Sequence, residues 1–119
     1  MMINVHNMDK LKIAEIVPNK ILLNIDEWVD ILGNLYYEGF DGVIINERSI
    51  APSFFELKSK IAGEVLQKFS NYNIRLTVVG NFIDLPSKSL TDFIYESNKG
   101  RHINFVDSTS EALRIFSTR

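Results

Sequence analysis

Residues 42–45 read Gly-Val-Ile-Ile, a short run without a polar side chain between two segments with a helical pattern. Residues 74–80 have the same character, because Leu76, Val78 and Val79 are apolar on both sides of an extended chain. Antiparallel strands commonly alternate apolar and polar residues, whereas a parallel strand covered on both faces is apolar throughout. The two runs therefore predict strands of a parallel sheet.

The segment before the first run predicts a helix. Asn24 or Asp26 can cap its first turn, and the charge of Glu27 favours the N-terminal end of a helix. Its apolar face is formed by Trp28, Leu32, Leu35 and Tyr36. Gly39 suits the left-handed conformation with which many helices end.

The segment between the two runs predicts a second helix. Ser53 and Glu56 have the spacing of a capping box and come directly after Pro52. We therefore expect the helix to begin at Ser53 and to end at Asn71 and Asn73.

Two more helices are predicted toward the C-terminus. Ser87 precedes one of them, and Asn98-Lys99-Gly100 closes it. A strand at residues 103–106 follows, and Ser108 and Glu111 form another capping box ahead of the last helix.

The N-terminal part predicts a hairpin from strands at residues 2–6 and 11–17, and residues 21–23 form either a third short strand or a lead-in. The element order is β-β-(β)-α-β-α-β-α-β-α. It predicts an α/β fold in which residues 1–119 form a single domain. The domain would have one mostly parallel sheet, an N-terminal β-hairpin and four helices, joined by right-handed crossovers.

Strands that are apolar on both faces raise the question of what covers the second face. If the parallel strands lie in sequential order, right-handed crossovers place their helices on one face only. We consider three covers for the other face: a reversed strand order, the hairpin with the first helix, or a second subunit. The last of these predicts a homodimer.

The composition excludes several classes of protein. The chain has 119 residues with a net charge of −2, so it lacks the basic surface that general nucleic-acid binding requires. It has no cysteine, which excludes disulfides and thiolate metal sites and suits the cytoplasm. No signal peptide or membrane-spanning stretch is expected. His6 and His102 lack a second ligand at suitable spacing, so we expect no metal and no cofactor.

Polar residues after the predicted parallel strands mark a candidate site. Ligands of such sheets usually bind beyond the carboxyl ends of the strands. The candidates for contact with a ligand or partner on this rim are Glu47, Arg48, Ser49, Ser53, Asn81, Asp84 and Lys88. Glu47 and Arg48 are the main pair, because an Arg can hold an anionic group through two parallel hydrogen bonds.

Each of these candidates also has a structural interpretation. Glu47 and Arg48 can form a solvated loop, or an ion pair that fixes the loop. Ser53 can hold a phosphate at a helix N-terminus or can simply be the N-cap. The adjacent rings of Phe54 and Phe55 point about 100° apart on a helix, so one of them is expected to reach a dimer or partner contact.

Two longer stretches are distinctive. Residues 51–58 read APSFFELK and continue as AGEVLQKFSNY at 62–72, and residues 87–101 read SKSLTDFIYESNKGR. The chain resembles the bacterial family known as domain of unknown function 4180, over nearly its whole length. The resemblance implies no activity. Family members commonly have an Asp where this chain has Asn81, which puts any role of an acid at that position in doubt.

The element order is also similar to that of STAS domains, the fold of bacterial anti-sigma-factor antagonists. Those regulators are switched by phosphorylation of a serine at the start of a helix, and Ser49 and Ser53 lie in the corresponding stretch. Their Asp-Ser signature is absent, because residues 46–50 read Asn-Glu-Arg-Ser-Ile, so we do not transfer the phosphorylation site. Fold similarity alone does not determine function.

No cluster of catalytic residues appears in the sequence, and we do not expect an enzyme. The expected function is a regulatory module that binds a protein partner. The alternative is a small-molecule-binding protein or small enzyme that uses the rim around Glu47 and Arg48.

Overall fold

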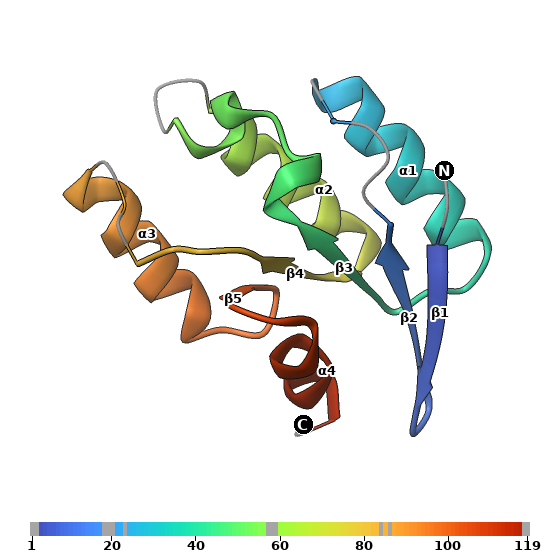
Figure 1. Cartoon of the computed structure of the whole chain (residues 1–119). Helices are drawn as coiled ribbons and strands as arrows, with labels where there is room; N and C mark the ends of the chain where they lie inside the picture. Colours follow the sequence, from blue (N-terminus) through green and yellow to red (C-terminus); the bar gives the residue numbers. More distant parts are fainter. Residues whose placement is uncertain are drawn as a thin grey trace.

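In a computed structural model that describes residues 3–17, 21–22, 24–56, 60–83, 85 and 87–117, the chain forms one five-stranded sheet with the order β1-β2-β3-β4-β5 (Figure 1). The strands are β1 (Ile3–Met8), β2 (Leu11–Ile16), β3 (Gly42–Asn46), β4 (Arg75–Val79) and β5 (Ile103–Val106). The hairpin β1–β2 is antiparallel, and every later pair is parallel. The predicted α/β class and mostly parallel sheet are confirmed.

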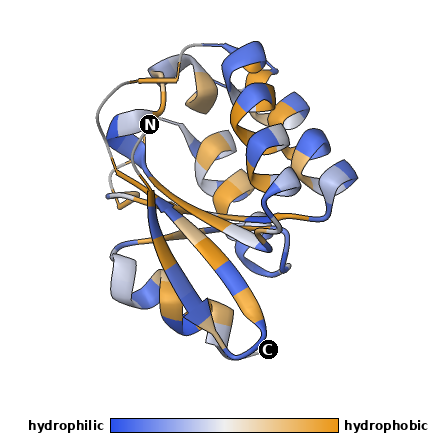
Figure 2. Cartoon of the chain, turned by 90° about the vertical axis from the view of Figure 1, so that its right-hand side faces the viewer, coloured by the Kyte–Doolittle hydropathy of each residue, from blue (hydrophilic) through white to orange (hydrophobic). Residues whose placement is uncertain are grey.

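Four α-helices and two short 3-10 helices connect or follow the strands in the described part of the chain. The α-helices are α1 (Ile25–Tyr37), α2 (Ile61–Tyr72), α3 (Lys88–Asn98) and α4 (Thr109–Ser117), and the 3-10 helices are η1 (Glu47–Ser49) and η2 (Pro52–Phe55). Helices α1, α2 and α3 lie on one face of the sheet, and α4 lies on the other (Figure 1). Figure 2 shows apolar residues along the inner sides of the helices.

Each face of the sheet has its own apolar core. On the face of α1–α3, the core joins β2–β5 to residues such as Trp28, Phe69 and Ile94. On the face of α4, the buried core residues are Ile13, Ile44, Val79, Ala112 and Phe116. Because successive residues of a strand point to opposite faces of the sheet, these two cores explain why the central strands have no polar side of their own.

The cover of the second face is α4, which is none of the three covers that we considered. The strand order is sequential, and the right-handed crossovers do place α1–α3 on one face. However, α4 follows the last strand and leads to no further strand, so the crossover rule does not constrain it. The second face therefore no longer supplies an argument for another subunit.

Most predicted helix ends are confirmed. The side chain of Asn24 accepts a hydrogen bond from the N–H of Glu27, and Ser87 and Ser108 accept equivalent bonds in the first turns of α3 and α4. Gly39 has a φ of 82°, as expected for a helix stop. Residues 21–22 are only a lead-in, in which Leu22 makes an isolated bridge to the segment after η1.

The predicted start of the second helix at Ser53 is wrong. Residues Pro52–Phe55 form the separate helix η2, and α2 begins only after Lys60, whose φ of 63° interrupts right-handed helical geometry. The ring of Phe54 is 1% exposed and stacks on Trp28, with 5.5 Å between the ring centroids. We attribute the different conformation to this tertiary contact, which outweighs the local capping pattern. Ser53 therefore does not cap α2.

One tyrosine and one histidine also differ from expectation. Tyr36 does not belong to the core, because it is 57% exposed and packs on Tyr72 of α2. His6 lies within β1 rather than at a strand end, and its Nε2 is 2.8 Å from Oε1 of Glu15 on β2. No α-helix in the described part of the chain is both long and apolar enough to cross a membrane.

Candidate functional site

The carboxyl ends of β3, β4 and β5 meet at one rim of the sheet. The parallel register places Asn46 beside Val79, and Val79 beside Val106. The loops that leave these three strands therefore start next to one another, as the parallel topology predicts. Among the described residues, at least three pockets lie around this rim.

Glu47 holds two of the loops together. It is the first residue of η1, and its Oε1 accepts a hydrogen bond from the N–H of Asn81 at 3.0 Å. Gly80 makes this contact sterically feasible, because a Cβ added there would lie 2.6 Å from Cδ of Glu47. The sequence predicts Glu47 and Asn81 on the same rim, and the structure brings them into direct contact.

The first pocket, which we call the Glu47 pocket, lies on the face of α1–α3. Its volume is about 320 Å³. Its wall is mostly apolar, and the rings of Phe55 and Phe82 pack at a centroid distance of 6.2 Å. The lining residues are Glu47, Pro52, Phe55, Glu56, Asn81, Phe82, Leu85 and Leu90. Among the described residues, Oε2 of Glu47 makes no hydrogen bond, so it can accept one from a ligand.

Arg48 faces a different pocket, which we call the Arg48 pocket. This pocket has a volume of about 170 Å³ and is lined by Glu15, Ile16, Ile44, Asn46, Arg48, Val79 and Thr109. Oδ1 of Asn46 accepts hydrogen bonds from the backbone N–H of Arg48 at 2.9 Å and from its Nε at 3.2 Å. Among the described residues, Glu47 and Arg48 therefore line different pockets, and neither of these two pockets combines both side chains.

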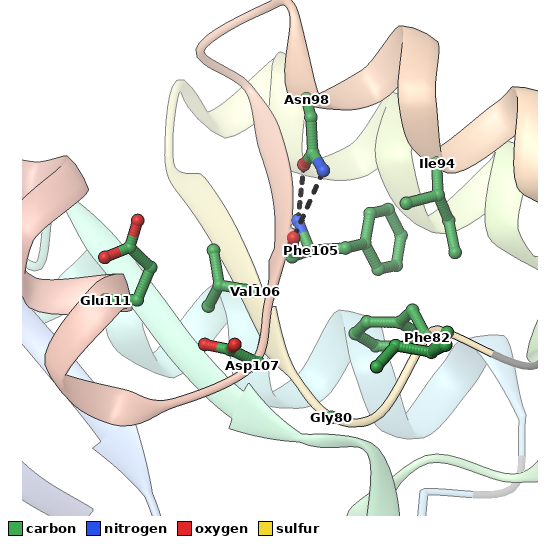
Figure 3. A pocket seen from close by; sticks show the side chains of 9 residues that line it. Gly80, Phe82, Ile94, Asn98, Phe105, Val106, Asp107 and Glu111 are labelled. Atoms are coloured by element: carbon green, nitrogen blue, oxygen red, sulfur yellow. Dashed lines mark hydrogen bonds between the residues drawn. The ribbon is translucent and has the colours of Figure 1, made fainter.

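The third pocket, which we call the β5 groove, is an open space of about 650 Å³ beside the edge of the sheet. Figure 3 shows an apolar end formed by Phe82, Ile94 and Phe105, and an acidic end with Asp107 and Glu111. Asn98 is the last residue of α3, and its side chain reaches the backbone of β5. Its Oδ1 accepts from the N–H of Phe105 at 2.7 Å, and its Nδ2 donates to the carbonyl of the same residue at 3.2 Å.

The acidic end of the β5 groove is partly neutralised. The guanidinium of Arg114 donates two hydrogen bonds to the carboxylate of Glu111, one of them from Nε at 2.8 Å. This hydrogen bonding, together with the positive charge, lowers the pKa of Glu111 and raises the pKa of Arg114. Glu111 is therefore charged at neutral pH, but its charge is matched within α4.

Three more predicted site residues, Ser49, Ser53 and Lys88, are not among the described residues that line these pockets. Ser49 is buried, and its Oγ makes no hydrogen bond to the described residues. Lys88 forms an exposed ion pair with Asp92 on α3. Ser53 belongs to η2, and Asp84 lies outside the described residues. No group of three or more residues suited to holding a metal ion is present in the described ranges.

Sequence reasoning missed several residues that shape the pockets. Phe55 lines the Glu47 pocket, and Phe82 lies between this pocket and the β5 groove. The adjacency of Phe54 and Phe55 did indicate that one ring leaves the core. The pair Gly80-Asn81 after an apolar strand was a second signal, since a glycine there admits a close contact.

A comparison with protein families covers most of the chain. The model of the family described as domain of unknown function, DUF4180, matches residues 8–115. The chain belongs to the DUF4180 family. All residues that line the three pockets of this DUF4180 domain lie within the matched range. No curated protein and no solved structure matches the DUF4180 domain, so the similarity to STAS domains stays a prediction from element order.

Proposed function

We propose that this DUF4180 domain is a small-molecule-binding module and that its ligand occupies the Glu47 pocket. The observation that supports the proposal is a carboxylate fixed by Asn81 in an otherwise mostly apolar pocket at the carboxyl ends of parallel strands. Ligand sites of α/β sheets commonly lie there. Such sites combine apolar walls with a few polar groups, and their volumes start at about 300 Å³.

The lining of the pocket defines the chemistry of the ligand. Phe55, Phe82 and Leu90 offer apolar contact to a flat or aliphatic body. Oε2 of Glu47 offers an acceptor, and the half-buried carboxylate favours a cationic or N–H donor group over an anionic one. We therefore propose a small amine or related cation with an apolar body as the ligand class.

A matched pair of probes tests the charge preference. Benzylamine and benzoate have similar bodies and opposite charges. We expect benzylamine to raise the melting temperature and benzoate to leave it unchanged. A ligand present at 100 times its Kd stabilises the folded state by about 2.7 kcal/mol. An equal or larger effect of benzoate, or no shift with either probe, would contradict the proposal.

Substitutions then locate the site. Glu47→Gln keeps the shape of the side chain but removes its charge, so the affinity for benzylamine should fall about tenfold or more. The matched control is Glu64→Gln, at an exposed position of α2 that is not among the described residues lining the Glu47 pocket. Calorimetric titration of both variants measures the difference, and equal loss in the two variants would place the binding elsewhere.

A second candidate is the regulatory, partner-binding module expected from the sequence and from the STAS-like element order. The observation that favours it is Ile83, which is 87% exposed at the mouth of the β5 groove. The cysteine-free composition supports a cytoplasmic setting for either function. Pull-down with Ile83→Ser and the native chain tests this candidate: a specific partner should be lost with the variant.

A further inference from the structure

We propose that the Arg48 pocket is a second binding site, for a small zwitterion of amino-acid size. Arg48 would hold the carboxylate of the ligand, and Glu15 would hold its ammonium group. The pocket lies on the face of the sheet that α4 covers, whereas the Glu47 pocket lies on the face of α1–α3. The two pockets therefore share no described lining residue.

The cationic wall of the pocket is preorganised. Asn46 accepts from both the backbone N–H and Nε of Arg48, and these two bonds orient the guanidinium group. Within the described residues, no ion pair neutralises Arg48, so its terminal N–H groups can bind a carboxylate through two parallel hydrogen bonds. Thr109, the first residue of α4, lines the same pocket and adds a hydroxyl group.

The anionic wall comes from the hairpin. Glu15 projects from β2 on the same face as His6 of β1, and the contact of 2.8 Å with the imidazole Nε2 holds one of its carboxylate oxygens. The other oxygen has no hydrogen bond within the described residues. An ammonium group has three donors, so it can satisfy this acceptor inside the pocket.

The two charged walls do not touch. Glu15 and Arg48 line one pocket but form no ion pair with each other. Opposite charges that face a shared space favour a ligand that carries both complementary charges, because either single charge would leave one wall unmatched.

The size of the pocket limits the ligand. Its volume of about 170 Å³ corresponds to roughly five or six waters at about 30 Å³ each. Ile44 and Val79, which belong to the core on the face of α4, provide apolar contact for a short aliphatic body. A small amino acid meets these limits, whereas a nucleotide or an aromatic amino acid exceeds them.

Titrations with alanine, acetate and methylamine test the proposal, because the last two ligands each contain one of the two charged groups. We expect alanine to shift the backbone amide resonances of Glu15, Arg48 and Thr109 in a saturable way. Acetate and methylamine should bind at least about tenfold more weakly. The proposal is overturned if acetate or methylamine binds as well as alanine, or if no shift occurs up to about 100 mM, beyond the millimolar range of weak binding.

Substitutions test the roles of Arg48 and Glu15 separately. Arg48→Met and Glu15→Gln should each weaken alanine binding at least about tenfold, while Lys68→Met on the exposed side of α2 should leave it unchanged. Equal weakening in all three variants would contradict the assignment. Glu47→Gln should also leave alanine binding unchanged, which separates this site from the Glu47 pocket. Circular dichroism of each variant verifies that it is folded.

Discussion

At the scale of single residues, Asn98 shows how one side chain can replace a neighbouring strand. It makes both hydrogen bonds that a further strand would make to the backbone of Phe105 (Figure 3). We expect Asn98→Ala to lower the free energy of unfolding by about 1–3 kcal/mol, because the half-buried N–H and C=O of Phe105 lose their partners. Urea denaturation measures the loss.

The control for this prediction is Asn71→Ala. Asn71 is also a helical asparagine, but it is exposed, and among the described residues its side chain makes a single hydrogen bond, which it accepts from Gln67. We expect its substitution to change stability by less than about 0.5 kcal/mol. Equal effects of the two substitutions would show that the contact of Asn98 with the strand edge is not what stabilises the fold.

A pair of glycines gives a second prediction at this scale. A Cβ on Gly42 would lie 2.5 Å from Cε1 of the buried ring of Phe116 and 3.0 Å from Ile13, so Gly42→Ala should destabilise the protein by about 1–3 kcal/mol. Gly63 lies within α2 with no atom near its Cβ position, so Gly63→Ala should stabilise by about 0.5–1 kcal/mol. Thermal unfolding compares them, and effects of the same sign would contradict the steric argument.

The role of Asn98 could not be predicted from the sequence, and the reason is physical. The sequence predicts that residues 98–100 end a helix, and the helix does end there. However, the hydrogen bonds to Phe105 depend on how α3 packs against β5, and local sequence contains no direct information about that packing. The distinctive stretch at residues 87–101 includes Asn98. Helix-capping rules do not describe the contact that this side chain makes with the edge of β5.

At the scale of elements, the segment between β3 and α2 marks the limit of local rules. The caps at Asn24, Ser87 and Ser108 were predictable because each depends on residues three positions apart. The start of α2 was not, because the burial of Phe54 against Trp28 involves two residues far apart in the chain. Local capping signals are therefore reliable here only where no buried aromatic contact competes with them.

Lys60 gives a prediction at the same scale. Its φ of 63° is costly for a side chain with a Cβ, by about 1–2 kcal/mol. Glycine removes this cost but adds freedom to the unfolded chain. We expect Lys60→Gly to stabilise the protein by about 0.5–1 kcal/mol in urea denaturation.

Asn73 is the comparison for Lys60. It has a similar φ of 56° at the end of α2, but asparagine adopts this conformation more readily. Asn73→Gly should therefore give a smaller gain than Lys60→Gly. Destabilisation by Lys60→Gly would show that the lysine side chain makes a contact that outweighs the backbone strain.

At the scale of the whole molecule, topology explains both what was and what was not predictable about the site. Parallel strands with a common direction bring their carboxyl ends to one rim, so the general location of Glu47, Arg48 and Asn81 followed from the sequence. Their division between two faces did not, because it depends on the turn of η1 and on the close approach of Glu47 to Gly80. Glu47 and Arg48, which are adjacent in the sequence, therefore line different pockets.

The two edges of the sheet differ, and this difference gives the last prediction. The edge of β5 is occupied at its centre by Asn98, whereas no described strand pairs with the outer side of β1. Exposed edges usually contain charges, prolines or bulges that prevent pairing. The six residues of β1 contain no proline and no Asp, Glu, Lys or Arg, and Val5 is 50% exposed. We therefore expect two chains to associate through antiparallel pairing of β1, across a twofold axis.

Sedimentation at increasing concentration tests this expectation. Val5→Lys should abolish association, because the pairing would bring two like charges close together across the axis. Ile83→Lys adds the same charge at an exposed apolar residue far from β1 in the sequence, so it should leave association unchanged. A native chain that stays monomeric at every concentration would contradict the expectation. Loss of association in both variants would instead indicate that exposed apolar residues, rather than the free strand edge, bring the chains together.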